Sequence, residues 1–130
     1  MPSVRPAFLA LLLATALGAG AAQAQPTTVN VVLSSYKFDP MELDLTHGQS
    51  YTLHLTNTSN KAHDLAAKAF FATAAIDPGS AASVRNGAIE VPQGGSVDVT
   101  LTPQIAGTYD MQCTHPLHAV LGMKGQIVVR

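Results

Sequence analysis

The chain has 130 residues, of which 47% are hydrophobic and 12% are charged, and its seven basic and eight acidic side chains give a formal net charge of −1. This length suits one globular domain. Because the charges form no block of one sign, the composition argues against binding to nucleic acid or to an anionic membrane surface.

The first 24 residues have the pattern of an export signal. Arg5 supplies a positive charge, residues 7–17 form an apolar run, and Ala22-Gln23-Ala24 matches a cleavage site. The run is shorter than the roughly 20 apolar residues that span a bilayer, although an uncleaved anchor is the alternative. We therefore predict a signal peptide at residues 1–24 and a periplasmic or secreted domain at residues 25–130, with no membrane span after cleavage.

The residues after the leader form short alternating segments separated by turn residues, which is the pattern of β-strands. The predicted strands, in chain order, are residues 29–33, 41–45, 51–55, 88–91, 97–101, 107–113 and 125–129. Seven or so short strands at this spacing indicate an all-β protein with an antiparallel β-sandwich. Residues 65–75 differ because they are rich in alanine and contain two phenylalanines, so we predict one short helix or a covering flap there.

The strand predicted at residues 107–113 ends on the only cysteine of the chain. Side chains two residues apart share one face of a strand, so Tyr109, Met111 and Cys113 are expected to face the core. An unpaired cysteine in an exported protein indicates a metal ligand, a reactive thiol or an intermolecular bridge. The alternative is a small buried hydrophobic residue, since free cysteine is often buried.

Imidazole and thioether groups follow this cysteine closely. Cys113 begins the segment Cys113-Thr-His115-Pro-Leu-His118-Ala-Val-Leu-Gly-Met123, and a further candidate ligand, His63, lies upstream. A thiolate with imidazoles and a thioether is the donor set that favours copper in an electron-transfer site. The thiolate and imidazoles suit both Cu(I) and Cu(II), and a weak thioether stabilises the reduced ion. The segment therefore predicts a copper centre.

Motifs along nearly the whole mature chain carry a family resemblance. They are Tyr36-x-Phe38-x-Pro40-x-x-Leu43, the Asn57 loop before His63-Asp64, Gly107-x-Tyr109 before the cysteine, and C-x4-H-x4-M ending in Gly122-Met123-Lys124-Gly125. In these motifs the chain resembles the cupredoxins, the small blue (type 1) copper proteins that include plastocyanin and azurin. Its ligand loop is most similar to those of rusticyanin and auracyanin.

The resemblance implies a Greek-key β-sandwich with one copper ion near one end. In this family two histidines and one cysteine bind the copper in a near-trigonal plane, and a distant methionine lies above it. By position, the resemblance implies that the ligands here are His63, Cys113, His118 and Met123. It also implies a carrier of single electrons with no enzymatic activity.

The remaining histidines and Asp64 depart from this ligand set. His115 stands where the family usually has an apolar or aromatic residue, and we expect it at the surface or behind the ligands, with copper binding as the alternative. His54 is expected to face outward on its strand, and His47 lies in a turn. Asp64 stands where many relatives have asparagine, so a donor that ties the two ligand loops together is missing unless Asp64 is used differently.

Three functions compete for this sequence. The first is a monomeric electron carrier that binds redox partner proteins through an apolar patch around His118. The patch consists of Pro116, Leu117, Ala119, Val120 and Leu121. The alternative is that these residues pack against the core as in an ordinary loop. The second is a copper chaperone or resistance protein that delivers metal to an acceptor, which the extra His115 favours. A Cys-His hydrolase would need an orienting side chain and a cleft, which a small domain with Cys113 at a strand end does not provide.

Overall fold

The computed structural model describes residues 3, 18 and 24–130. The signal peptide predicted at residues 1–24 therefore lies almost entirely outside the described residues. In the part of the chain that is described, none of the helices combines the length and the apolar character needed to cross a membrane.

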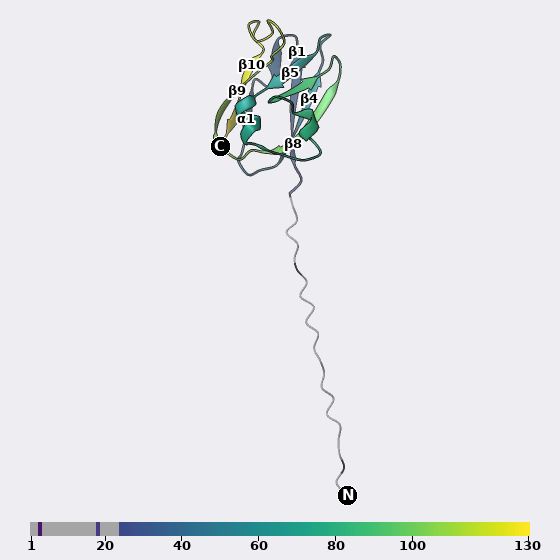
Figure 1. Cartoon of the computed structure of the whole chain (residues 1–130), viewed down its shortest axis with the longest axis vertical. Coiled ribbons are helices and arrows are strands. Elements are labelled where there is room, and N and C mark those ends of the chain that lie inside the picture. Colours follow the sequence, from purple (N-terminus) through teal and green to yellow (C-terminus); the bar gives the residue numbers. More distant parts are fainter. Residues whose placement is uncertain (1–2, 4–17, 19–23) are drawn as a thin grey trace.

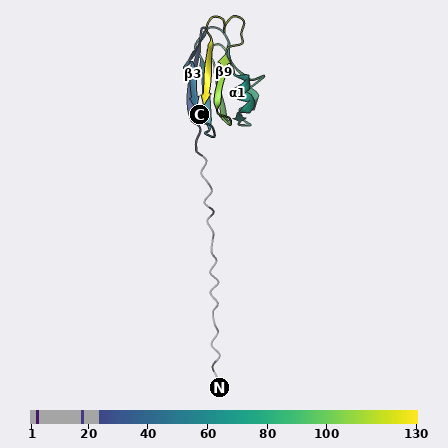
Figure 2. The same ribbon diagram turned by 90° about the vertical axis from the view of Figure 1, so that its left-hand side faces the viewer.

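Two five-stranded sheets form a sandwich, with strand orders β2-β1-β4-β8-β6 and β3-β10-β9-β5-β7 (Figure 1). The strands are β1 (Thr27–Ser34), β2 (Lys37–Asp39), β3 (Glu42–Leu45), β4 (Tyr51–Asn57), β5 (His63–Ala66), β6 (Ala75–Ile76), β7 (Ala88–Val91), β8 (Ser96–Thr102), β9 (Gly107–Gln112) and β10 (Lys124–Val129). Figure 2 shows β3 and β9 on either side of the yellow strand β10. The predicted all-β sandwich is confirmed.

Each sheet also contains one parallel pair, which the expectation of an antiparallel sandwich did not include. Strand β1 pairs in parallel with β4, and β3 pairs in parallel with β10, whereas the other strand pairs are antiparallel. The parallel pairs arise because the chain crosses to the second sheet at β3 before it returns to the first at β4. Local alternation of side chains reports burial and carries no information on strand direction.

All seven predicted strands are present. The helix predicted at residues 65–75 is also present, but its predicted boundaries were wrong. Residues 65–66 belong to β5, the helix α1 covers only Lys68–Thr73, and residues 75–76 form β6. A 3₁₀ turn follows at Ala81–Ser83. Strand β5 escaped prediction because it does not alternate: His63, Asp64 and Leu65 are all buried. A strand covered on both faces has no period-2 signal.

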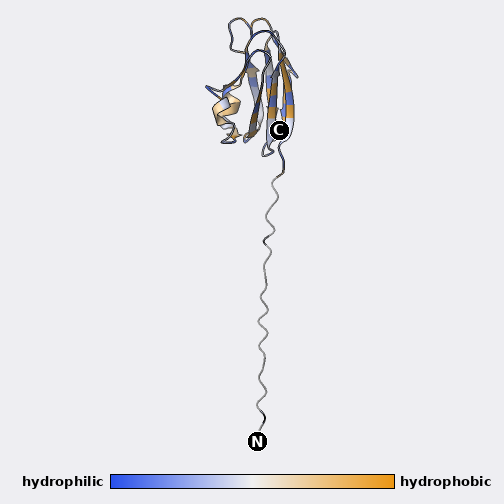
Figure 3. Ribbon diagram, turned by 90° about the vertical axis from the view of Figure 1, so that its right-hand side faces the viewer, coloured by the Kyte–Doolittle hydropathy of each residue, from blue (hydrophilic) through white to orange (hydrophobic). Residues whose placement is uncertain are grey.

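The core lies between the two sheets. Hydrophobic and polar residues alternate along the strands (Figure 3). Strand β4 alternates buried and half-buried residues over its whole length. Helix α1 closes one flank of the core by burying Phe70 and Phe71. The ring of Phe70 meets that of Tyr109 edge-on, with centroids 5.6 Å apart. Full burial of a phenylalanine side chain stabilises the fold by about 1.5–3 kcal/mol.

The buried side chains of strand β9 extend the core to one end of the sandwich. Met111 and Cys113 are 1% exposed, whereas Asp110 and Gln112 are exposed, so the predicted inward face is confirmed. The connection from β9 to β10 lies at the end of the sandwich away from the C terminus (Figure 1). Cys113 therefore sits where the dry interior meets a surface loop.

Candidate metal centre

Two segments that are distant in sequence supply the predicted donors. His63 is the first residue of β5, whereas Cys113, His118 and Met123 lie in the connection between β9 and β10. This connection is closed on itself: the Cys113 N–H donates to the Met123 carbonyl at 3.1 Å, and the Met123 N–H donates to the His118 carbonyl at 3.0 Å. The loop therefore holds its three predicted ligands in a fixed order.

Two glycines permit this loop to close. Gly122 has a φ of 110°, a conformation that residues with a Cβ rarely adopt. A Cβ on Gly125 would lie 2.2 Å from the Met41 carbonyl oxygen and 2.5 Å from the methyl carbon of Met111. The Gly-Met-Lys-Gly sequence thus allows the chain to turn at Met123 and then to enter β10 close against its neighbours.

The sulfur of Cys113 and one nitrogen from each of two histidines converge. The His63 Nδ1 atom lies 3.1 Å from the His118 Nδ1, and the Cys113 Sγ lies 3.4 Å from the His118 Nδ1 and 3.9 Å from the His63 Nδ1. His63 and Cys113 are almost completely buried, and His118 is 8% exposed. The structure therefore brings together three of the four predicted ligands through their donor atoms.

The triangle of donor atoms has the dimensions of a metal site. Metal bonds of about 2.0–2.3 Å to nitrogen and sulfur place the donors of a trigonal plane roughly 3.5–3.9 Å apart. The observed separations are 3.1, 3.4 and 3.9 Å, so the distance between Cys113 and His63 falls in this range and the two distances to the His118 Nδ1 are slightly shorter. The His63 Nε2 atom is buried without a hydrogen-bond partner among the described residues, so the nitrogen with polar neighbours is the one in the triangle. One thiolate and two imidazoles fit a copper ion.

Met123 is the fourth predicted ligand, and its side chain is fully buried. Its backbone is hydrogen-bonded to both Cys113 and His118, which fixes its position relative to the other donors. The structure thus keeps Met123 in the same closed loop. A buried thioether in the same closed loop as a thiolate and an imidazole is suited to be a weak additional ligand.

Burial controls the protonation of the donors when no metal is bound. Burial lowers the pKa of His63, and the nearby His118 and His115 lower it further. Burial also lowers the pKa of His118, with smaller contributions from His115 and Lys61. Conversely, burial raises the pKa of the Cys113 thiol. The imidazoles are therefore ready to bind a cation, whereas the thiol must lose its proton when a metal binds.

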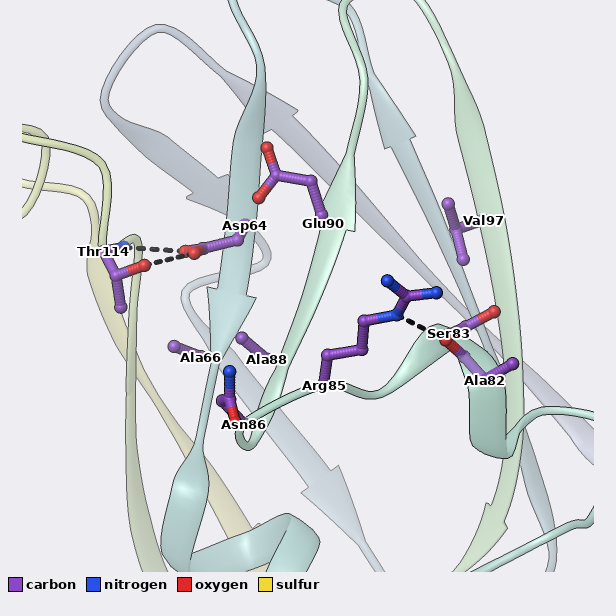
Figure 4. Close-up of a pocket in the computed structure, with 10 residues that line it drawn as sticks. All are labelled: Asp64, Ala66, Ala82, Ser83, Arg85, Asn86, Ala88, Glu90, Val97 and Thr114. Atoms are coloured by element: carbon purple, nitrogen blue, oxygen red, sulfur yellow. Dashed lines mark hydrogen bonds between the residues drawn. The ribbon is translucent and has the colours of Figure 1, made fainter.

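Asp64 ties the two ligand segments together, although as an acceptor where many relatives offer an amide donor. Its carboxylate accepts a hydrogen bond from the Thr114 N–H at 2.7 Å and a short one from the Thr114 hydroxyl. Figure 4 shows both bonds, which join the residue after His63 to the residue after Cys113. The hydrogen bond between the two ligand loops that we expected to be missing is therefore present, with Asp64 as the acceptor and Thr114 as the donor.

Asn57 fixes the loop that leads into His63. Its side chain is 1% exposed and donates to the carbonyls of Lys61 at 2.7 Å and Val91 at 3.1 Å. Its side-chain oxygen accepts hydrogen bonds from the N–H and the hydroxyl of Ser59. Both the donor and the acceptor group of this buried amide have hydrogen-bond partners, and these bonds hold the backbone that leads into β5 in one conformation.

The other histidines lie outside the donor triangle. His115 Nε2 pairs with the Glu90 carboxylate oxygens at 2.9 and 3.1 Å, and its ring stacks on His118 with centroids 5.5 Å apart and planes 16° apart. This agrees with the prediction of a surface or supporting residue. His54 pairs with Asp98 on the exposed side of the first sheet, and His47 is exposed in a turn.

Three residues to which the sequence analysis gave no role lie around the donors. Tyr36 contacts His118, whereas Thr114 and Glu90 contact the neighbouring Asp64 and His115. The ring of Tyr36 meets the His118 ring edge-on with centroids 5.1 Å apart. The family motif contained Tyr36, which was the only available signal. Thr114 and Glu90 gave no signal because strand pairing and loop closure bring them to the site.

The apolar residues predicted around His118 are at the surface. Leu117, Val120 and Leu121 have exposed fractions of 70%, 81% and 56%. Leu117 has a φ of 68°, a left-handed conformation in which its side chain is exposed while the next residue, His118, is buried. The three side chains form an exposed apolar collar beside the least buried donor.

The comparisons with known proteins agree with this geometry. The family model for a cupredoxin-like domain matches residues 7–129. A reduced auracyanin from Roseiflexus castenholzii is 26% identical, with 82% of this chain and 99% of that chain covered and a TM-score of 0.61. Auracyanin A of Chloroflexus aurantiacus, a blue copper protein, is also 26% identical, with 82% and 100% covered and a TM-score of 0.57.

A larger protein resembles this chain in its fold but has little sequence identity to it. A multicopper oxidase from Campylobacter jejuni is 12% identical, with a TM-score of 0.62, and 85% of this chain matches only 31% of that chain. No curated protein sequence has significant similarity to the chain.

Proposed function

This chain belongs to the cupredoxin-like family, and we propose that it is an exported carrier of single electrons. Its cofactor is one copper ion. We assign His63, Cys113, His118 and Met123 as the copper ligands. The observation that carries the assignment of the first three is the convergence of one sulfur and two nitrogen atoms within 3.9 Å in a buried site. Burial of Met123 in the same closed loop supports its assignment as the fourth.

Copper, when bound, supplies a centre that accepts and returns one electron. The chain's own residues keep the donors in place during that exchange. Burial of His63 and Cys113 excludes water from the donors, and the hydrogen bonds from Thr114 to Asp64 fix the backbone next to Cys113. Donors that cannot move present nearly the same geometry to both oxidation states, which keeps the rearrangement on electron transfer small.

The route to the surface is through His118. Its 8% exposure, compared with none for His63, makes it the ligand that reaches the apolar collar of Leu117, Val120 and Leu121. A small apolar contact suits brief association with redox partners. Buried donors favour retention of the metal, and this supports electron transfer over copper delivery as the function.

Export is the second part of the proposal. The pattern of residues 1–24 supports removal of a signal peptide before Gln25, and a single cysteine held as a metal ligand suits a compartment that oxidises free thiols. The mass of the protein isolated from its host tests this. A mature chain beginning at Gln25 is expected, whereas a retained Met1 in a cytoplasmic fraction would contradict export.

The visible spectrum tests the copper assignment. The copper-loaded protein should have an intense visible band from charge transfer between the Cys113 sulfur and copper. Cys113→Ser should fold and lack this band. A Cys113→Ser protein that stays blue would refute the ligand set.

Electron self-exchange tests the carrier function. Mixed oxidised and reduced samples should show fast exchange by NMR line broadening, and Val120→Asp should slow it without altering the spectrum. Ile105→Asp is the matched control, because Ile105 is also exposed but precedes the opposite end of β9. Slow exchange in the unmutated protein would favour copper delivery.

A further inference from the structure

Two carboxylates face each other beside the metal centre. The register of β5 and β7 places Asp64 directly opposite Glu90. Like charges at directly opposed positions destabilise a sheet, so this pair requires compensating partners. Asp64 accepts two hydrogen bonds from Thr114, and Glu90 accepts hydrogen bonds from His115 (Figure 4 shows the first pair and the position of Glu90). Both partners belong to the segment that follows Cys113.

Glu90 holds the His115 ring in one orientation. The His115 Nε2 lies 2.9 and 3.1 Å from the two Glu90 carboxylate oxygens. The His115 side chain is 29% exposed, so one part of the ring contacts protein while the rest meets solvent. Because the carboxylate comes from β7 and the ring from the ligand loop, the pair fastens the loop to the sheet.

The fastened ring lies flat against a predicted ligand. The planes of His115 and His118 are 16° apart, and their centroids are 5.5 Å apart. Tyr36 meets the same His118 ring edge-on at 5.1 Å, and His63 lies at 4.8 Å with a tilt of 56°. Three rings thus surround His118, and its Nδ1 is left facing the Cys113 Sγ at 3.4 Å.

We propose that Glu90 and His115 are positioning residues for His118. Glu90 orients the imidazole of His115, and the face of that imidazole restricts the His118 ring to the orientation in which Nδ1 faces the metal position. The inference rests on the proposed ligand role of His118. It assigns a function to a histidine that stands where the family usually has an apolar or aromatic residue.

Ring dynamics in the metal-free protein test this inference without relying on copper. Nitrogen relaxation of the His118 imidazole, measured in protein labelled at histidine and held near pH 8, above the ordinary imidazole pKa, should show a rigid ring. Glu90→Ala and His115→Ala should make the ring mobile. His115→Phe keeps a ring face and Glu90→Gln keeps an acceptor, so both should restore much of the rigidity.

The rate of copper loss to a chelator is the second readout. Loss of an aromatic pair is expected to speed copper loss about two- to tenfold in His115→Ala, with His115→Phe close to the unmutated protein. His54→Ala is the matched control, because it removes another histidine–carboxylate pair, with Asp98 at 2.5 Å, on the other sheet. It should leave both readouts unchanged.

The outcomes separate this inference from the proposed function. An equally rigid His118 ring in Glu90→Ala and His115→Ala would overturn the positioning role, even if the copper-loaded protein is blue. Lower thermal stability with unchanged ring dynamics would also overturn it, since the pair would then only stabilise the loop. Absence of the visible band in the unmutated copper-loaded protein would refute the proposed function and leave the ring measurement valid. Should His115→Ala fail to fold, the comparison of Glu90→Ala with Glu90→Gln decides the question.

Discussion

Removing the carboxylate of Asp64 should loosen the junction between the two ligand segments. Asp64 is 5% exposed and accepts hydrogen bonds from both the N–H and the hydroxyl of Thr114. In Asp64→Ala both donors of Thr114 lose their partner. Asp64→Asn keeps an oxygen that accepts from the N–H, and its amide can donate to the hydroxyl oxygen, so it should be the milder change.

The magnitude follows from the contacts. Hydrogen bonds to a charged group contribute about 1.5 kcal/mol each at the low end, so Asp64→Ala loses about 3 kcal/mol. Relief of repulsion from Glu90, whose exposed carboxylate has an oxygen within 4.8 Å of an Asp64 carboxylate oxygen, returns about 1 kcal/mol when the two charges are screened as in water. The net loss is about 2 kcal/mol in the free energy of unfolding, or roughly 10 °C in Tm. Asp64→Asn should lose about 1 kcal/mol, because neutral bonds replace charged ones.

Urea denaturation of the metal-free protein measures these values, and Thr114→Val completes a double-mutant cycle. Thr114→Val removes the hydroxyl and keeps the backbone bond, so the cycle should give a coupling of about 1.5 kcal/mol with Asp64→Ala. Full additivity of the two changes would show that the hydroxyl bond contributes nothing. An Asp64→Ala protein as stable as the unmutated one would refute the reasoning for both bonds.

Three further predictions concern the donors themselves. In copper-loaded protein, His118→Gly should regain its visible band when imidazole is added, whereas His63→Gly should not, because only His118 reaches the surface. An absorbance titration with imidazole measures this, and equal recovery in both variants would contradict it. Met123→Leu should keep the blue colour and raise the reduction potential measured by voltammetry, since a weak electron donor to Cu(II) is lost; a lowered potential would count against an axial role. The metal-free protein should lose stability below about pH 6.5, where the unfolded chain takes up protons before His63 and His118 do, because their folded-state pKa values are lowered. It should also lose stability above about pH 9, where the unfolded thiol ionises before the folded Cys113, whose pKa is raised. Urea denaturation across this range tests both limits, and a flat profile would contradict them.

The sequence was most informative where a two-residue alternation of apolar and polar side chains predicted a strand and its buried face. Alternation along residues 107–113 predicted the inward face of β9, and the structure places Met111 and Cys113 there. Strand β5 could not be predicted in this way, because His63 and Asp64 are both buried and break the alternation. The resemblance to the cupredoxins implied a common site, and the Nδ1 and Sγ atoms of three of the four implied ligands do converge.

The contacts around the donors were beyond the reach of sequence patterns. Asp64 looked like a lost donor, since only the fold shows that Thr114 supplies the protons instead. Glu90 meets His115 because the register of β5 and β7 puts it there, and that register depends on tertiary pairing. Strand registers and loop closures of this kind follow from the packing of the whole chain, and short motifs do not encode them.

A copper site of this kind has to keep its ligands dry and still lie close to a surface, and the segment around His118 meets both needs. The left-handed backbone of Leu117 leaves its side chain 70% exposed while His118 next to it is buried. Such a conformation costs a residue with a Cβ on the order of 1 kcal/mol, so surrounding contacts must maintain it. The hydrogen bond from the Met123 N–H to the His118 carbonyl and the stacked ring of His115 are contacts of that kind. The same backbone turn thus exposes an apolar collar next to the buried ring of His118, the ligand through which we propose that a redox partner exchanges electrons with the metal.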